Sequence, residues 1–197
     1  MSPLKLAFLI AAIVTQTVSA TLAGNKFLDE KSGFTIEKPQ DWVFNKEQKS
    51  YGIQLNTEKM TSAETGILVS FTKKMPAGFQ GVKPSVGVKT LDSVKPGSNL
   101  QQWLANELKS QETHDKFFAP GSPATASSID GITGAAQAAY VNSTVIDGRE
   151  FHVYHVLYVV PAGKKTFLVN MNCNDDLANK YVGVFGEIAG SIRVDKP

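Results

Sequence analysis

The sequence contains a single cysteine, Cys173, among 197 residues. A lone cysteine cannot close a disulfide within the chain, so the fold must be held together by its core. Its neighbours Asn172, Asn174 and Asp175 carry no positive charge that would stabilise a thiolate. We therefore expect Cys173 to be a small buried hydrophobe at a strand end, with an intermolecular disulfide or a reactive thiol as the alternatives.

Histidine is also scarce, and its spacing does not suit metal or acid–base chemistry. His152 and His155 lie three apart on a predicted strand, which points their side chains to opposite faces, and His114 lies in a polar segment. A catalytic zinc site takes three protein ligands, and that spacing is missing. No Gly-x-Ser-x-Gly motif occurs, and no pattern couples Cys173 to a histidine. We therefore predict packing or surface roles for the histidines, no cofactor, no metal and no enzymatic activity.

The net charge is low, at +2 from 20 basic and 18 acidic residues. This balance is too close to neutral to predict binding to nucleic acid or to acidic lipid. The hydrophobic fraction of 42% is sufficient for a packed core, and the length fits one domain.

Long apolar runs are absent except at the N-terminus. Lys5 precedes the apolar run 6–14, and Val18-Ser19-Ala20 places small residues where signal peptidase reads them. The run is far shorter than the ~20 residues that a membrane-spanning helix needs. Residues 1–20 are therefore predicted to be a cleavable secretory signal; an uncleaved anchor is the alternative.

Cleavage is predicted after Ala20, with Ala23 as a second candidate site. No cysteine follows either site, so a lipid anchor is not predicted. We expect residues 25–197 to form one exported domain, periplasmic or secreted, with no integral membrane segment after cleavage.

Alternation of apolar and polar residues predicts a series of short strands. The predicted strands are Gly33–Lys38, Trp42–Phe44, Tyr51–Leu55, Ile67–Phe71, Val86–Leu91, Gly134–Thr144, Glu150–Val160, Thr166–Met171 and Ile192–Val194. Asp147-Gly148 predicts a tight hairpin turn, because both residues tolerate a positive φ. The strand at 150–160 is apolar on both faces, so we expect it to be central.

Two helices are predicted. Ser98-x-x-Gln101 is typical of a capping box, and an apolar stripe carries that helix to about Gln111. Asp175 or Asp176 is expected to cap a last helix, whose glycines at 183, 186 and 190 are expected to allow close packing. The predicted fold class is α+β, with an antiparallel sheet of about six to eight strands flanked by two main helices.

Three segments resemble the PsbP-like superfamily of exported bacterial and thylakoid-lumen proteins. They are Phe34-x-Ile36-x-x-Pro39-x-x-Trp42, the strands from Tyr140 through Phe167, and Phe185-x-x-Ile188-x-x-Ser191-Ile192-Arg193-Val194. The resemblance implies an α/β/α sandwich and a binding or accessory role, since members mostly lack known catalysis. No functional motif of the family matches here, so no functional residue is carried over.

One polar run resembles the start of a calcium loop. Asn170, Asn172 and Asn174 alternate before Asp175, but the positions that need glycine and a bidentate glutamate hold Asp175 and Tyr181. We therefore interpret the run as a strand end followed by a helix cap. Asn142-Ser143-Thr144 is a glycosylation sequon, a triplet that arises readily by chance.

Two loops are the candidates for binding a partner, an unknown protein or envelope component. The loop Met75–Pro84 contains Phe79 among glycines and follows Lys73 and Lys74, so these three residues are the predicted contacts. The second loop is His114–Ser128. Two alternatives stay open: a small-molecule binder or hydrolase with a pocket lined by residues such as His155, Tyr158 and Asn170, and a secreted factor that acts on a host. The oligomeric state is not indicated.

Overall fold

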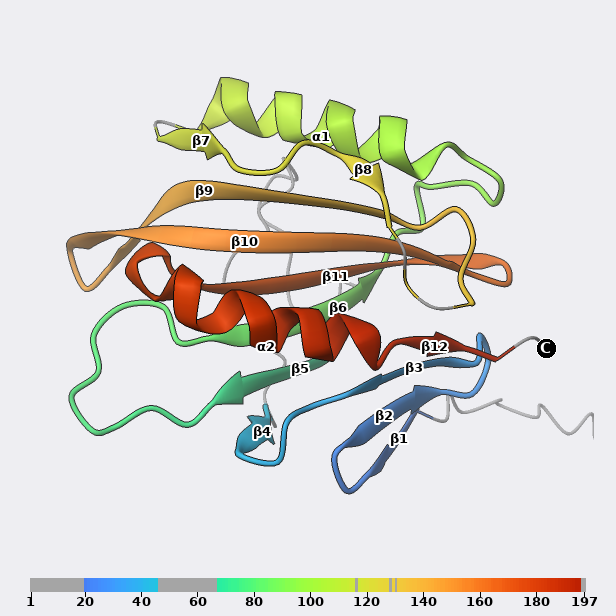
Figure 1. The fold of residues 1–197 in the computed structure, drawn as a ribbon, viewed down its shortest axis with the longest axis horizontal. Helices are drawn as coiled ribbons and strands as arrows, with labels where there is room; N and C mark the ends of the chain where they lie inside the picture. The colour runs from blue at the N-terminus through green and yellow to red at the C-terminus, as the bar shows by residue number, and fades with distance from the viewer. Residues whose placement is uncertain (1–19, 46–66, 116, 128, 130, 196–197) are drawn as a thin grey trace, which may run out of the picture.

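A computed structural model describes residues 20–45, 67–115, 117–127, 129 and 131–195 (Figure 1). Residues 1–19 of the predicted signal and the predicted strand Tyr51–Leu55 therefore lie outside the described residues. Within them, an eight-stranded antiparallel sheet has the order β4-β5-β6-β11-β10-β9-β7, with β8 also paired to β9. Its strands are β4 (Trp42–Phe44), β5 (Ile67–Lys73), β6 (Ser85–Thr90), β7 (Phe118–Pro120), β8 (Thr125–Ala126), β9 (Ala136–Ile146), β10 (Arg149–Ala162) and β11 (Lys165–Asn174).

The predicted fold class is confirmed, because two helices flank this sheet. They are α1 (Leu100–His114) and α2 (Ala178–Gly190), and a short 3-10 turn, η1 (Asp175–Leu177), precedes α2. Figure 1 shows α2 lying across the large sheet, where it contacts β11 and β10, whereas α1 lies alongside β7 and β9. The strand β10 is central as predicted, and Asp147 and Gly148 take φ values of 50° and 75° in the turn that leads to it.

A second, four-stranded sheet was not predicted. It has the order β1-β2-β3-β12, formed by β1 (Ala20–Ala23), β2 (Lys26–Asp29), β3 (Phe34–Glu37) and β12 (Arg193–Val194). The segment before Gly33 reads as polar, yet Phe27 is only 1% exposed and packs in the main core. One buried aromatic side chain in a short hairpin was too weak a periodic signal to predict a strand.

Three local predictions were wrong in detail. Asn99, not Ser98, caps α1, because its Oδ1 accepts a hydrogen bond of 3.0 Å from the Gln102 N–H. Neither aspartate of η1 caps α2 through its side chain, since the chain first makes the 3-10 turn. The segment His114–Ser128 is less open than predicted, because β7 and β8 within it pair with β9.

Alternation along β11 creates two cores on opposite faces of the large sheet. Phe167, Val169 and Met171 point to the side on which α2 and the small sheet pack. Leu168 points to the other side and belongs to the cluster that contains Leu104 of α1. The molecule is thus a layered α+β sandwich, with β11 buried on both faces.

The small sheet is joined to the large one by an aromatic pair and a buried ion pair. Phe34 stacks on Phe167 at 4.4 Å between ring centroids. Asp29, 1% exposed, accepts hydrogen bonds from the Ser32 hydroxyl at 2.6 Å and from Lys165 Nζ at 2.9 Å. Burial alone would raise the pKa of Asp29, but these two hydrogen bonds, the positive charge of Lys165 and a hydrogen bond from the Lys31 backbone together hold the pKa below its usual value.

The glycines of α2 do not serve close packing, contrary to the prediction. A Cβ atom built on Gly183, Gly186 or Gly190 would meet no other atom within 4 Å. Each glycine in a helix costs roughly 0.5–1 kcal/mol relative to alanine, because it has more backbone freedom to lose on folding. The described contacts give no compensating gain.

Replacing Gly186 by alanine should therefore stabilise the protein, by roughly 0.5–1 kcal/mol in the free energy of unfolding. The measurement is urea denaturation followed by circular dichroism. Gly81→Ala is the matched control and should destabilise by roughly 1–3 kcal/mol, because a residue with positive φ and a crowded Cβ is strained. Gly81 has φ +95° and would place a Cβ 2.5 Å from the Asn174 amide. A destabilising Gly186→Ala variant would contradict the open surface seen on α2.

Candidate functional site

A row of asparagines lies on the α1-side face of β11. Asn170, Asn172 and Asn174 alternate with apolar residues, so all three point to one face, and they are only 2%, 2% and 9% exposed. The Asn172 Oδ1 accepts a 2.8 Å hydrogen bond from the Ser85 hydroxyl, and the Asn174 Oδ1 accepts one of 2.7 Å from the Val82 N–H. The run that resembles a calcium loop is therefore a set of buried amides, each with its own protein partner.

His155 continues this polar row onto β10. Its Nε2 lies 3.0 Å from the Asn142 Oδ1, the Asn170 amide lies 3.2 Å from its Nδ1, and its ring stacks on Tyr140 at 4.6 Å. The Asn142 Nδ2 already donates to the Asp115 carboxylate at 3.1 Å. The Asn142 Oδ1 is then an acceptor, which assigns the proton of the neutral ring to Nε2. Nδ1 is then an acceptor as well, so this assignment requires the Asn170 amide to turn its Nδ2, rather than the Oδ1 placed there, toward the ring.

These contacts change the interpretation of the predicted pocket. His155 and Asn170 do come together, but as a hydrogen-bonded pair inside the sheet face that α1 covers. Tyr158 lies on the opposite face, where it packs against the core below α2. The three residues proposed as one pocket lining are thus divided between two faces of β10 and β11.

The buried state of His155 predicts a specific loss of stability in acid. Burial lowers the pKa of His155 to about 4, from an ordinary value near 6.5, so the unfolded chain binds a proton that the folded chain does not. Stability should fall as the pH drops from about 6.5 to about 4, by up to roughly 3 kcal/mol for this group. We expect the free energy of unfolding to depend less on pH in His155→Gln over this window. An unchanged slope in that variant would show that His155 is protonated in the fold.

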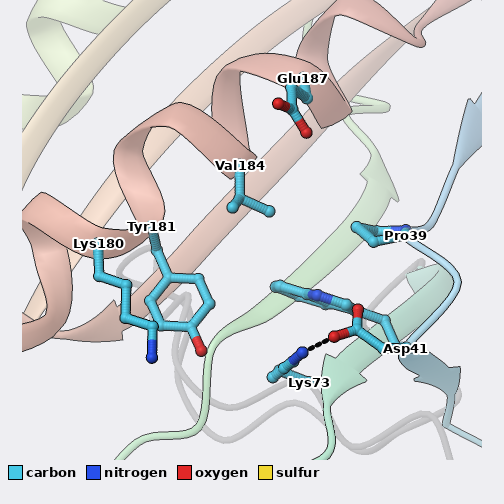
Figure 2. A pocket seen from close by; sticks show the side chains of 8 residues that line it. Pro39, Asp41, Lys73, Lys180, Tyr181, Val184 and Glu187 are labelled. Carbon is cyan, nitrogen blue, oxygen red and sulfur yellow. Dashed lines mark ion pairs between the residues drawn. The ribbon is translucent and has the colours of Figure 1, made fainter.

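A shallow pocket lies elsewhere, between α2 and the edge of the large sheet at β4. Figure 2 shows Lys180, Tyr181, Val184 and Glu187 in a row along α2, facing Pro39, Asp41 and Lys73 across the pocket. Trp42 completes the lining, and the volume is about 260 Å³. The floor is mostly apolar and the charged groups stand around it.

Trp42 and Tyr181 fix the shape of this pocket. Trp42 is 2% exposed and meets Tyr181 edge-on at 6.3 Å, and Tyr181 is 4% exposed. Both rings are held by the core, since Trp42 also packs edge-on against Phe71 at 5.9 Å. The base of the pocket is therefore held by the core, whereas Asp41, Lys180 and Glu187 at its rim are exposed side chains.

Charges of both signs line the pocket. Asp41 and Lys73 form an ion pair with one another (Figure 2). Lys180 lies 5.7 Å from the centroid of the Tyr181 ring. Among the described residues, neither Lys180 nor Glu187 forms an ion pair. Both side chains come from α2, so this helix lines the pocket with one positive and one negative charge that have no ion-pair partner among those residues.

Of the three predicted partner contacts, Lys73 lines this pocket and the other two lie in or next to the adjoining loop. Lys73 is the last residue of β5, Lys74 is exposed, and Phe79 is partly exposed in the loop Met75–Pro84. Asn174 holds the far side of this loop, through hydrogen bonds with the Val82 N–H at 2.7 Å and the Gln80 carbonyl at 3.3 Å. The loop is thus fixed at both ends, while Phe79 lies between them.

The remaining candidate, Cys173, is completely buried, as predicted. Burial, with a further contribution from Asp175 and Asp176, raises the pKa of its thiol to about 12. The thiol is therefore protonated and unreactive at neutral pH. Within the described ranges, no three histidine, cysteine or carboxylate side chains are placed to share a metal ion.

The pocket could hardly be predicted from the sequence, because its walls come from three distant segments. Two signals were nonetheless present. Trp42 follows Pro39 closely, which marks an aromatic side chain near a strand end, and Lys180-Tyr181-x-x-Val184-x-x-Glu187 places a charged and apolar row on one edge of the last helix. Neither of the two helices in the described part of the chain has the length and apolar character needed to cross a membrane.

Comparison with known proteins bears on the fold. No protein-family model matches the sequence, and no curated protein matches it either. The solution structure of CyanoP, the cyanobacterial PsbP of Synechocystis sp. PCC 6803, aligns over 94% of this chain and 98% of its own length, with a TM-score of 0.50 and 14% identity. LpqN of Mycobacterium tuberculosis, a protein involved in cell envelope biogenesis, aligns over 91% and 90% respectively, with a TM-score of 0.52 and 15% identity. The predicted resemblance to the PsbP-like superfamily is confirmed at the level of the fold.

Proposed function

We propose that this chain is an exported, non-enzymatic binding protein that recognises a protein partner of the cell envelope. Its binding surface is the loop Met75–Pro84 together with the α2 pocket, the cavity between α2 and β4. The observation that carries the proposal is the position of Lys73, which lines the pocket and, as the last residue of β5, lies two residues before the loop. The Lys73 N–H donates to the Pro84 carbonyl at 2.9 Å, so both ends of the loop meet beside the pocket.

The way in which the loop is held supports a recognition role. Gly81 approaches the Asn174 side chain so closely that no side chain fits there, and Val82 is 7% exposed. The Pro76 carbonyl accepts a 3.2 Å hydrogen bond from the Phe79 N–H, which forms a turn at the tip. A loop already ordered in the free protein loses less conformational entropy on binding.

The size of the pocket argues against the alternative of a small-molecule binder or hydrolase. Pockets that enclose a drug-sized ligand have volumes of roughly 300–1,000 Å³ and cover most of the ligand surface. The α2 pocket has about 260 Å³ and is bounded by a single helix and a sheet edge. It suits a side chain or short segment of a larger partner better than a free ligand.

The likeness to LpqN supports the envelope setting of the proposal. LpqN is involved in cell envelope biogenesis, and it shares the fold over most of both chains. At 15% identity the shared fold does not by itself transfer a function. The proposal therefore depends on the loop and the pocket of this chain.

A photo-crosslinking amino acid placed at position 79 should form a covalent adduct with a discrete partner in the cells that produce the protein. The same substitution at Val145, 68% exposed at the end of β9, is the control and should form none. Adducts are detected by a mass shift on denaturing gels and identified by mass spectrometry. Adduct formation at position 145 but not at 79 would show that the binding surface lies elsewhere.

The proposed export predicts a mature protein that begins at Thr21. Cleavage after Ala20 leaves Thr21–Ala23 paired with β2, whereas cleavage after Ala23 would remove all of β1. The intact mass of the protein recovered from the cell envelope or the medium measures the site. A mass that includes residues 1–20 would contradict export by a cleaved signal, and a start at Gly24 would show that β1 is dispensable.

A further inference from the structure

The loop Met75–Pro84 presents a neutral tip between two lysines. Lys74 directly precedes the loop, Lys83 is its second-last residue, and residues 75–82 between them are uncharged. The Lys73 N–H donates to the Pro84 carbonyl at 2.9 Å, so Lys74 and Lys83 stand on the two sides of the loop's neck, one residue beyond this bond. Both lysines are exposed.

A third cation comes from a distant part of the chain. Arg149 is the first residue of β10, and its guanidinium donates to the side-chain carbonyl of Gln80 in the loop. Figure 1 shows the turn between β9 and β10 at the same end of the molecule as this loop. The Gln80 amide is neutral, so this contact leaves the positive charge of Arg149 uncancelled. Lys74, Lys83 and Arg149 are called the loop cations below.

The loop cations form no ion pair within the described part of the chain. Lys74 and Lys83 carry the same charge on the two sides of one neck, and like charges that face each other across paired segments lower stability. An anionic group that pairs with these lysines would relieve the repulsion. The loop therefore suits a partner that carries negative charge.

The surroundings of the loop favour a protein over a membrane or a nucleic acid. Exposed carboxylates adjoin the loop cations, two in the hairpin that carries Arg149 and two directly after Asn174, the residue that holds the loop. They are Asp147, Glu150, Asp175 and Asp176. A lipid surface or a nucleic acid is negative throughout, so these carboxylates would repel it. A protein can place acidic side chains opposite the loop cations alone.

The tip of the loop adds an apolar surface between the cations. Pro76 and Ala77 are exposed, and Phe79 is partly exposed. Aromatic side chains and arginine are enriched at protein interfaces, where they combine apolar contact with polar pairing. A partner that complements this surface therefore presents carboxylates around an apolar side chain.

We propose that the loop Met75–Pro84 binds an acidic segment of a partner protein, in which carboxylates lie on both sides of an apolar residue. The carboxylates pair with the loop cations, and the apolar residue covers Phe79. This inference rests on the proposed function, of which it specifies the partner's chemistry.

The test uses the mature protein and three fluorescently labelled peptides of equal length. The acidic peptide is Gly-Asp-Glu-Leu-Glu-Asp-Gly. The neutral peptide has Asn for each Asp and Gln for each Glu, and the basic peptide has Lys at all of these positions. Binding is followed by the fluorescence anisotropy of the peptide. Vesicles of phosphatidylglycerol and phosphatidylcholine, followed by co-sedimentation, test a membrane as the alternative.

We expect the acidic peptide to bind at least about 10-fold more tightly than the other two, and about 0.5 M NaCl to remove most of this preference because it screens exposed charges. The double variant Lys74→Glu with Lys83→Glu should weaken that binding by about 10-fold or more, since two attractions become two repulsions. Lys74→Arg with Lys83→Arg should retain it. The matched control Lys95→Glu with Lys109→Glu changes the net charge equally, at exposed residues before and within α1, and should leave the affinity within about 2-fold.

Three results would overturn the inference: no binding of the acidic peptide at about 5 mM, equal binding of the neutral peptide, or an effect of the matched control as large as that of the loop variant. A preference for the vesicles that is lost in Lys74→Glu with Lys83→Glu would assign the loop cations to a membrane instead. The crosslink at position 79 separates this inference from the proposed function. A discrete protein adduct whose yield is unchanged in Lys74→Glu with Lys83→Glu would leave the protein partner standing and remove only its acidic chemistry.

Discussion

The strand β11 is buried on both faces, and this constraint organises the rest of the molecule. A strand presents alternate residues to opposite sides, so one sequence of ten residues must satisfy two different environments. Phe167, Val169 and Met171 supply the apolar side, on which α2 and the small sheet rest. The opposite side begins with Leu168 and then becomes a row of amides. Buried amides are costly unless they are hydrogen-bonded, and each of these has a partner on a neighbouring strand or loop.

The two sides of β11 position the two parts of the proposed binding surface separately. On the amide side, Asn174 holds the Gln80–Val82 part of the loop. On the apolar side, the core fixes Tyr181 and, through Phe71, the ring of Trp42. Lys73 lies where these two supports meet, at the end of β5. The loop and the pocket are thus adjacent on the surface although the interactions that hold them lie on opposite faces of the sheet.

Much of the fold could be predicted from the sequence, because alternation and turn chemistry act locally. The order of β9, β10 and β11 follows from their long alternating runs and from Asp147-Gly148 between the first two. The small sheet could not be predicted, since its strands are four residues or shorter and one of them comes from near the C-terminus.

The pocket could not be predicted for a related reason. Its shape depends on how α2 packs near β4, and tertiary contacts rather than local sequence determine that packing. For the asparagines, the alternation was visible in the sequence and was interpreted as a strand end. The structure places all three in β11, each beside a separate partner.

The position of the proposed binding surface is compatible with a fold that is shared while the surface differs. The core of this chain lies at β11 and β10, whereas the pocket is formed at the outermost strand, β4, and along one edge of α2. Charged residues at that edge, such as Lys180 and Glu187, do not contribute to the core, so they can change without loss of the fold. The exposed glycines of α2 also lie outside the core. They lower the stability of the helix, and no described contact compensates for that cost. A fold likeness at 14% identity therefore reports on the core and not on the chemistry of this edge.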